Sequence, residues 1–411
     1  MRFYNFVLLI FFIPFVLVYA ILSLFNKRLR DTFPARLGFS SFPFSLNNPV
    51  WFHCSSLGEV KAIESLVLQL KKRYPAIFIS TLTETGLQKA KDLVQDNCSI
   101  IPFDINFLTR RFIKKLKPRL LVIEETEIWP NLIHQADAFG IPVIYINALI
   151  SKKSSRFYNH FNFLFSPVLN RINTFFIQNE ETSRHLRSLR VPSRKIKFIG
   201  ITKFDLTFQV SKAVSVFSSP SSIITCGSTR EGEEQILINV FQKLKKRFPS
   251  LKIIIIPRHI ERIGRIKKLL DDKYIDYDLF SRLVKKTDKD VFIVDKIGVL
   301  MKMYHLSDIS FIGGTLVPIG GHNPLEPAFL KKPIVFGPHI HNNYVAFTLL
   351  LKNRAALMVK NEKELEIKLS YLLSHPSVRK KMGQSAMATL KKNQGASKRL
   401  LDVIWKKYLK K

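Results

Sequence analysis

Cysteine is scarce in this chain, with three residues among 411: Cys54, Cys98 and Cys226. All three lie in or beside apolar runs, and their spacing matches neither a zinc site nor a disulfide framework. The sequence therefore excludes a zinc-stabilised or disulfide-stapled protein, and we expect each thiol to act as a small buried apolar residue.

Acidic residues are also few. Aspartate and glutamate total 31 against 65 lysines and arginines, which gives a formal net charge of +34. No zinc spacing, RNA-binding aromatic motif or basic helix–loop pattern accompanies this charge, so we expect no nucleic-acid partner. Short basic runs such as 71–73 and 245–247 instead end amphipathic helices. We expect the excess charge to attract an anionic membrane surface and a phosphorylated lipid.

One long apolar run is present at residues 6–25, which as a helix would span about 30 Å, the thickness of a bilayer core. Pro14 is tolerated in such a helix. A cleaved signal peptide, a buried helix and a retained anchor are the alternatives, and the poor cleavage site at 18–20 disfavours the first. Three basic residues at positions 27–30 favour a cytoplasmic body. We therefore predict a single N-terminal anchor in residues 1–30.

Short apolar runs alternate with helical patterns along the rest of the chain, which predicts α/β domains with parallel sheets. A serine-rich stretch at 211–222 predicts a linker between domains 31–210 and 211–411. Ligands of such sheets bind at the carboxyl ends of the strands. The predicted strands are 50–53, 77–81, 99–102, 120–124, 143–147, 174–178, 196–199, 222–226, 252–256, 292–294, 309–312 and 334–336.

The most informative segment is 313–327, which follows the apolar run 308–312. Two glycine pairs in it would let backbone N–H groups approach a ligand. A helix start follows, and its positive end favours an anion. We predict a ligand-binding loop with the following candidate residues: Gly313, Gly314, His322, Asn323 as N-cap, Pro324 at N1, Leu325 and Glu326 at N3.

Six segments occur in one order: 53–60, 125–131, 147–151, 200–205, 257–262 and 320–327. Together this set resembles the Kdo transferases of lipid A biosynthesis, which move 3-deoxy-D-manno-octulosonic acid (Kdo) from CMP-Kdo to a lipid A precursor. The resemblance covers nearly the whole chain. It implies the GT-B fold, in which two Rossmann-like domains face each other across a cleft, the first binding the acceptor and the second CMP-Kdo. It also implies an inverting transfer to lipid IVA at the cytoplasmic side of the inner membrane.

In the N-terminal domain the resemblance makes Glu59 the general base, which takes the proton from the attacking sugar hydroxyl. The alternative is a glutamate that only stabilises a helix N-terminus. Glu125, with Thr126 and Glu127, is expected to line the cleft, or alternatively to cap the next helix. Lys203, at the domain junction, is expected to meet the Kdo carboxylate or Glu59.

In the C-terminal domain, Pro257 and Arg258 end an apolar strand, and Arg258 is expected to bind the CMP phosphate. A surface arginine paired with Glu261 is the alternative. Ser228, in the run 228–230, is a possible donor contact. Gly298, Val299 and Leu300 match a family tripeptide that carries glutamate at its middle place, so a side-chain contact with cytidine is in doubt there. The resemblance gives segment 323–326 to the nucleotide.

No DxD-type carboxylate pair follows a strand with a histidine in a metal-binding arrangement, so we predict neither a metal ion nor another cofactor. Two other classes stay open at this point. A nucleotide-sugar epimerase shares the two-domain fold, but the apolar N-terminus and the 53–60 segment count against it. A basic membrane-surface or RNA-binding protein would not need the loop at 320–327.

Overall fold

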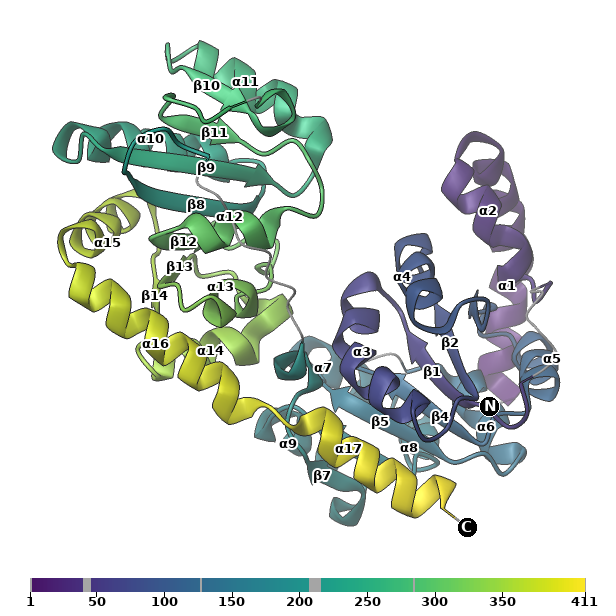
Figure 1. Ribbon diagram of the computed structural model, residues 1–411. Coiled ribbons are helices and arrows are strands. Elements are labelled where there is room, and N and C mark those ends of the chain that lie inside the picture. The colour runs from purple at the N-terminus through teal and green to yellow at the C-terminus, as the bar shows by residue number, and fades with distance from the viewer. Residues whose placement is uncertain (1, 40–45, 126–127, 207–215, 284, 411) are drawn as a thin grey trace. The chain divides into compact units, whose positions relative to one another are not determined.

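The computed structural model describes residues 2–39, 46–125, 128–206, 216–283 and 285–410. The chain folds into two compact units, Met1–Thr207 with Asn393–Lys411, and Phe208–Lys392 (Figure 1). Each unit contains a seven-stranded parallel sheet. Two parallel α/β domains are therefore confirmed.

The last helix, α17 (Ala396–Ile404), packs on the first unit, whereas the predicted division left it with the second. The Asp205 carboxylate accepts hydrogen bonds from the backbone N–H of Gly395 at 2.5 Å and of Ser397 at 2.6 Å. Leu400 and Ile404 join the apolar core of the first unit. The chain therefore returns to its first domain because the Asp205 carboxylate there caps the start of α17, and because the apolar face of α17 packs into the core of that domain.

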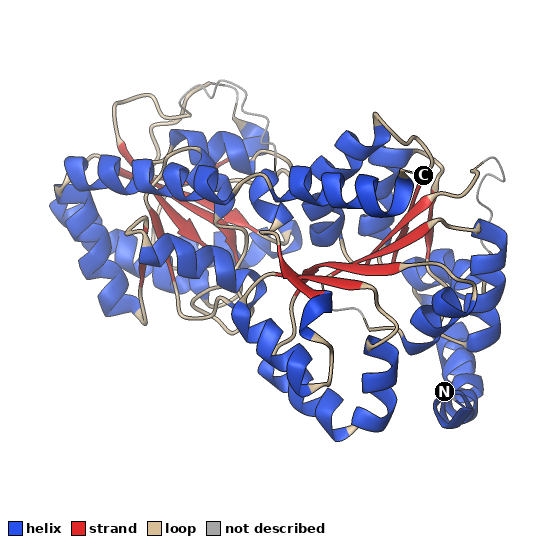
Figure 2. Ribbon diagram, turned by 90° about the horizontal axis from the view of Figure 1, so that it is seen from below, coloured by secondary structure: helices blue, strands red, loops and turns tan. Residues whose placement is uncertain are grey.

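The first sheet has the strand order β3-β2-β1-β4-β5-β6-β7. Helices cover both of its faces (Figure 2), which explains why its central strands are continuous apolar runs rather than alternating ones. Its strands are β1 (Val50–Cys54), β2 (Ile77–Thr81), β3 (Cys98–Ile100), β4 (Leu120–Glu124), β5 (Val143–Ala148), β6 (Thr174–Ile177) and β7 (Ile196–Phe198). Its helices are α3 (Leu57–Lys71), α4 (Glu84–Val94), α5 (Asn106–Leu116), α6 (Pro130–Ala138), α7 (Lys152–His160), α8 (Asn162–Leu169) and α9 (Glu180–Ser188).

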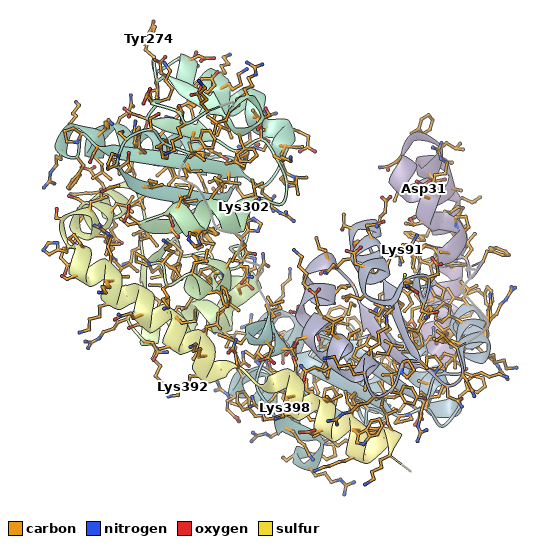
Figure 3. The ribbon with its side chains drawn as sticks, in the orientation of Figure 1. Asp31, Lys91, Tyr274, Lys302, Lys392 and Lys398 are labelled. Carbon is orange, nitrogen blue, oxygen red and sulfur yellow. The ribbon has the colours of Figure 1, made fainter. Side chains whose placement is uncertain are left out.

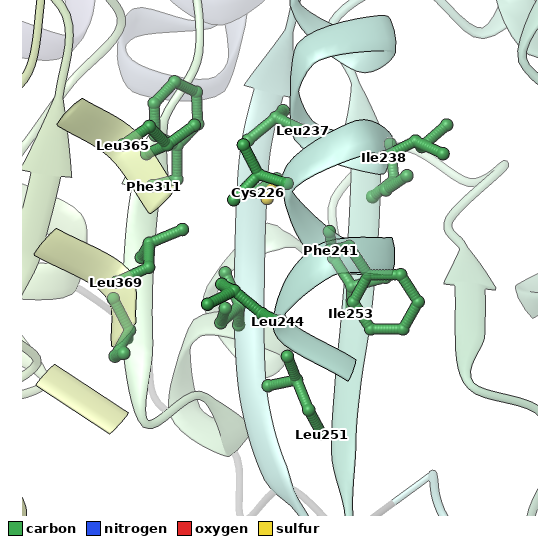
Figure 4. Packing of buried hydrophobic residues seen from close by; sticks show 14 of the residues in the cluster. Cys226, Leu237, Ile238, Phe241, Leu244, Leu251, Ile253, Phe311, Leu365 and Leu369 are labelled. Atoms are coloured by element: carbon green, nitrogen blue, oxygen red, sulfur yellow. The ribbon is translucent and has the colours of Figure 1, made fainter. Parts of the chain in front are cut away.

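The second sheet has the order β10-β11-β9-β8-β12-β13-β14. Leu237, Phe241 and Leu244 of α10 pack against β8 and β9 beside Cys226 (Figure 4). The strands are β8 (Ser222–Thr229), β9 (Leu251–Pro257), β10 (Tyr277–Leu279), β11 (Val291–Ile293), β12 (Ile309–Ile312), β13 (Ile334–Phe336) and β14 (Ala356–Met358). The helices are α10 (Glu233–Arg247), α11 (Ile263–Asp271), α12 (Leu300–Leu306), α13 (Leu325–Phe329), α14 (Tyr344–Lys352), α15 (Glu362–Ser374) and α16 (Pro376–Asn393).

The N-terminal apolar run forms α1 (Arg2–Phe25), followed by α2 (Lys27–Arg36). Tyr4–Phe25 is long and apolar enough to cross a membrane, with a mean hydropathy of 2.9 and 6 % burial. One side of α1 rests on the first unit, where the Phe103 ring contacts the rings of Phe12, Phe15 and Tyr19.

All three cysteines are buried free thiols, as expected. Among the basic side chains, Lys91, Lys302, Lys392 and Lys398 are exposed and come from four different helices, α4, α12, α16 and α17 (Figure 3). The positive charge is therefore spread over both units.

Candidate functional site

Glu59 lies at the N-terminus of α3, directly after the carboxyl end of β1. Its carboxylate accepts hydrogen bonds from the backbone N–H of Ser55 at 2.7 Å, from the Ser55 hydroxyl and from the Ser56 hydroxyl at 3.2 Å. The Ser56 hydroxyl in turn accepts from the backbone N–H of Glu59 at 3.4 Å, a variant of the capping box. Glu59 therefore stabilises the helix start, and the same bonds fix its carboxylate at the carboxyl edge of the sheet.

Glu125 follows β4, the strand next to β1, and has a left-handed backbone with φ of 58°. Its carboxylate forms an ion pair with the ammonium group of Lys203. Burial has the largest single effect on the pKa of Lys203 and lowers it, but the opposing contributions together are greater and the net pKa is raised; the charge of Glu125 contributes most to that rise. Glu124 and Glu59 raise it further, so the three carboxylates lie near one lysine. Lys203 is therefore near enough to Glu59 for its pKa to respond to that charge, but its direct partner is Glu125.

Capping of α6 by Glu125, the alternative raised from the sequence, is wrong. The Asp104 carboxylate instead accepts from the backbone N–H groups of Asn131 at 3.0 Å and Leu132 at 2.8 Å, which are the free donors at that helix start. Thr126 and Glu127 lie outside the described residues.

Glu124, the last residue of β4, was not among the predicted site residues. Its side chain is buried, and its Oε1 accepts from the side-chain amide N–H of Asn147 at 2.6 Å, while the side-chain Oδ1 of Asn147 accepts from the Thr202 backbone N–H at 3.0 Å. Burial, followed by the charge of Glu125, raises the pKa of Glu124 well above its usual range. The Asn147–Thr202 link also holds the turn that carries Lys203. Two adjacent acids at a strand end were the sequence signal for this network.

In the second unit, the loop after β12 is built around Glu233 of α10, a second residue that sequence reasoning missed. The two oxygens of its carboxylate accept hydrogen bonds from four backbone N–H groups: Gly314 at 2.7 Å, and Arg230, Thr315 and Leu316 at 2.9 Å each. The Gly314 N–H, which was expected to face a ligand, is therefore turned inward, because a buried carboxylate 81 residues away in sequence accepts its hydrogen bond.

The glycine at position 313 serves close packing. Its N–H donates to the Gly227 carbonyl at 2.9 Å, and a Cβ there would lie 2.3 Å from the Ser228 carbonyl oxygen. Only a residue without a side chain lets the end of β12 come so near to β8. The glycine pair thus shapes the loop rather than presenting its N–H groups outward.

Basic side chains gather where the neighbouring strands β9, β8 and β12 end. The Arg230 guanidinium donates from Nε to His322 Nε2 at 3.1 Å, and its Nη1 lies 2.7 Å from His259 Nε2. Burial, followed by the charges of Arg230 and Arg258, lowers the pKa of His322 to about 4 and also lowers that of His259. Both histidines are therefore neutral near pH 7. The group as a whole is cationic and suits an anion.

Arg258 directly follows the buried Pro257 at the end of β9, and its side chain is exposed. Among the ion pairs of the described residues, none joins Arg258 to Glu261, so the paired-surface alternative has no support. Burial, and next the charge of Arg258, lowers the pKa of Arg230, which shows that the two guanidinium groups repel each other. Ser228 lies near them on β8, half-buried and with φ of 59°.

The remaining predicted residues lie in two short turns. Gly298 has φ of 90°, and the buried Val299 packs into the apolar cluster beneath α12, which begins at Leu300. A nucleotide contact by Val299 would therefore use its backbone. At α13, the Asn323 side-chain oxygen accepts from the Leu325 N–H at 3.0 Å, but the N-cap is Pro324, one residue later than predicted. Glu326 is half-buried in the first turn of that five-residue helix.

Comparison with known proteins decides the family. Residues 31–206 match the family described as 3-deoxy-D-manno-octulosonic-acid transferase (kdotransferase). The 3-deoxy-D-manno-octulosonic acid transferase of Haemophilus influenzae is 32 % identical over 100 % of this chain and 99 % of its own length. The chain belongs to the Kdo transferase family. This Kdo transferase is therefore a glycosyltransferase, and the family predicted from its motifs is confirmed.

Two further relatives agree. The Aquifex aeolicus 3-deoxy-D-manno-octulosonic acid transferase is 30 % identical over 79 % of this Kdo transferase and 86 % of its own length. A bifunctional glycosyltransferase/methyltransferase of Fusobacterium nucleatum is 34 % identical over 77 % of this chain but only 51 % of its own length.

Solved structures support the GT-B-like fold of the Kdo transferase. The UDP-GlcNAc 2-epimerase of Neisseria meningitidis matches with a TM-score of 0.61 and 14 % identity, over 87 % of this chain and all of its own. A putative UDP-N-acetylglucosamine 2-epimerase of Listeria monocytogenes matches with a TM-score of 0.62 and 12 % identity, over 87 % and 96 %. At such identities the likeness shows the fold alone, so it gives no evidence that this chain has epimerase activity.

Within the ranges that the structure describes, no three or more histidine, cysteine, aspartate or glutamate side chains form a group that could hold a metal ion. Metal-independent transfer stays a prediction, to be tested with chelators.

Proposed function

We propose that this Kdo transferase moves Kdo from CMP-Kdo to a lipid A precursor, lipid IVA, with inversion at the anomeric carbon. The family membership supports the sugar and the reaction class. The observation that carries the proposal is the Glu59 carboxylate, which three hydrogen bonds hold at the carboxyl edge of the first sheet. We also propose that α1 keeps the enzyme on the inner membrane, with both units in the cytoplasm.

The proposed role of Glu59 is that of general base. The acceptor hydroxyl forms a bond to the anomeric carbon of Kdo while its proton passes to Glu59. The bond from that carbon to the phosphate oxygen breaks, and CMP leaves with the bonding electrons. Because Ser55 and Ser56 already hold the carboxylate, little reorientation is needed when the hydroxyl arrives. A single displacement of this kind inverts the configuration.

The proposed role of Arg258 and Arg230 is to bind the phosphate of CMP-Kdo. Their mutual repulsion is relieved when an anion lies between or beside them, and the charge that develops on the leaving phosphate strengthens the interaction. A leaving phosphomonoester carries less charge than a diphosphate, so we expect two arginines to suffice without a metal ion.

Replacement of Glu59 by glutamine tests the proposal. The amide keeps the shape of the side chain but cannot take up the proton, so transfer to purified lipid precursor, supplied with CMP-Kdo made in situ, should fall about 100- to 10,000-fold. Mass analysis of the lipid measures transfer, and CMP-dependent protection against thermal unfolding should be unchanged. The control Glu64→Gln alters a partly exposed glutamate of the same helix that pairs with Lys89. Transfer by Glu59→Gln within a few-fold of the control would remove Glu59 from this role.

A further inference from the structure

A helical hairpin formed by α7 and α8 follows β5 directly. Asn147, near the carboxyl end of β5, belongs to the network that contains Glu124 and Thr202. In a parallel sheet the segment after a strand begins at the carboxyl edge, so α7 (labelled in Figure 1) begins at the same edge as Glu59.

The hairpin exposes three phenylalanines. Phe157, Phe161 and Phe163 are 53 %, 36 % and 67 % exposed. Beneath them the Tyr158 and Phe165 rings pack with centroids 4.6 Å apart, and Phe165 is buried. The hairpin therefore has an apolar base of its own, and although the Phe157 ring contacts the rings of Phe161 and Phe165, about half of its side chain stays exposed. Exposed apolar side chains gathered in this way are typical of a binding surface.

The charge around these rings has one sign. Lys152, Lys153 and Arg156 of α7 are exposed, and no acidic residue occurs anywhere between positions 151 and 173. Nearby acids on α9 already have partners, because Glu180 pairs with Arg187 and Glu181 lies 4.0 Å from His185. A surface of exposed phenylalanine and unneutralised lysine and arginine is complementary to phosphate headgroups above acyl chains.

We propose that the α7–α8 hairpin docks on an anionic lipid bilayer, with Phe157, Phe161 and Phe163 at the level of the headgroups and Lys152, Lys153 and Arg156 on lipid phosphates. The inference rests on the proposed function, since a lipid acceptor lies in such a bilayer. Docking turns the carboxyl edge of the first sheet, and with it Glu59, toward the lipid surface. The hairpin thereby orients an enzyme that α1 keeps at the membrane, and it gives the sugar hydroxyl of an embedded acceptor access to the base.

Insertion of the rings can be measured directly in the full-length protein. Phe163→Trp, in vesicles that contain brominated phosphatidylglycerol, should lose fluorescence beyond the loss seen for the wild type, whose three tryptophans set the background. The matched control is Phe139→Trp. Phe139 is 39 % exposed and follows the C-terminus of α6, so it lies toward the opposite edge of the sheet. Equal quenching of the two variants would overturn the proposal, because it would show that the hairpin does not enter the bilayer and that its exposed rings serve another partner, such as a protein.

The basic residues are tested with the triple variant Lys152→Glu, Lys153→Glu and Arg156→Glu. Each lost cation should weaken attraction to the anionic surface about fivefold, so the apparent KM for acceptor in anionic vesicles should rise at least tenfold. CMP-dependent thermal protection should not change, which controls for folding. An unchanged KM, or equal Phe163→Trp quenching in neutral phosphatidylcholine vesicles, would refute the electrostatic part. If wild-type protein transfers no Kdo, the proposed function fails, whereas the quenching result still decides whether the hairpin inserts.

Discussion

Replacement of Glu233 should destabilise the second unit more than any other single change to an acid there. Each oxygen of its carboxylate accepts two backbone N–H groups, and all four donors are held around it within 2.9 Å. Glutamine keeps one oxygen but turns an NH₂ group toward the other pair of donors. Two hydrogen bonds to a charged acceptor are then lost, at about 1.5–3 kcal/mol each.

The expected loss for Glu233→Gln is therefore about 3–6 kcal/mol. A typical domain is stable by only about 5–15 kcal/mol, so the second unit should unfold at a clearly lower denaturant concentration. Glu233→Ala removes all four bonds, but water can enter the space and replace part of them, so its loss should be of similar size. Because Glu233 holds the loop 314–316, both variants should also lose CMP-dependent thermal protection.

Urea unfolding followed by circular dichroism measures the effect, with Glu231→Gln as the control. Glu231 lies two residues earlier, is largely exposed and pairs with the exposed Arg265. Such a pair contributes about 0–1 kcal/mol, so the control should unfold almost as the wild type does. If Glu233→Gln and Glu231→Gln unfolded alike, the carboxylate would not be what holds the loop, and the reasoning from its four hydrogen bonds would be refuted.

Three further predictions concern the donor site. Arg258→Ala should weaken CMP binding by about 1.5–3 kcal/mol and leave cytidine binding nearly unchanged, since only CMP carries a phosphate; calorimetry showing equal losses for both ligands would contradict the phosphate contact. Stability should fall as the pH drops from about 6.5 to 4, because His322 has a folded pKa of about 4 and the unfolded chain takes up the proton first. This loss of unfolding free energy amounts to about 3 kcal/mol at most. In thermal melting, the melting temperature of His322→Asn should therefore fall less between about pH 6.5 and 4 than that of the wild type; an identical fall in both proteins would exclude His322 as the source of the loss. Transfer should persist in excess EDTA, because the phosphate-binding groups are cationic side chains, and a loss restored by Mg²⁺ would require a metal site.

The cores of both sheets could be predicted from local pattern. Runs such as Leu120–Glu124 and Leu251–Pro257 are apolar throughout because helices cover both faces, and their length and spacing indicate buried parallel strands. The three-residue edge strands β10 and β14, which are only partly buried, were missed, whereas β11 and β13, which are equally short but buried throughout, were predicted. Strands that are buried throughout were therefore easier to predict from the sequence than short, partly buried strands at the edge of a sheet.

Glu59 could be placed at its helix start from the sequence because the interactions there are local: Ser55, Ser56 and Glu59 lie within one turn. Arg258 was found in the same way, as the residue that follows a strongly apolar strand. The partners of more distant residues depend on how the chain packs. Glu233 accepts from Gly314, and Asp205 from Gly395, 190 residues away; nothing near either acid in sequence shows that choice. The sequence by itself thus determined most of the strands and placed Glu59 at the start of its helix, while the folded chain decided which buried carboxylate takes which free N–H, because an unpaired buried donor must be satisfied by whichever acceptor the tertiary structure brings within reach.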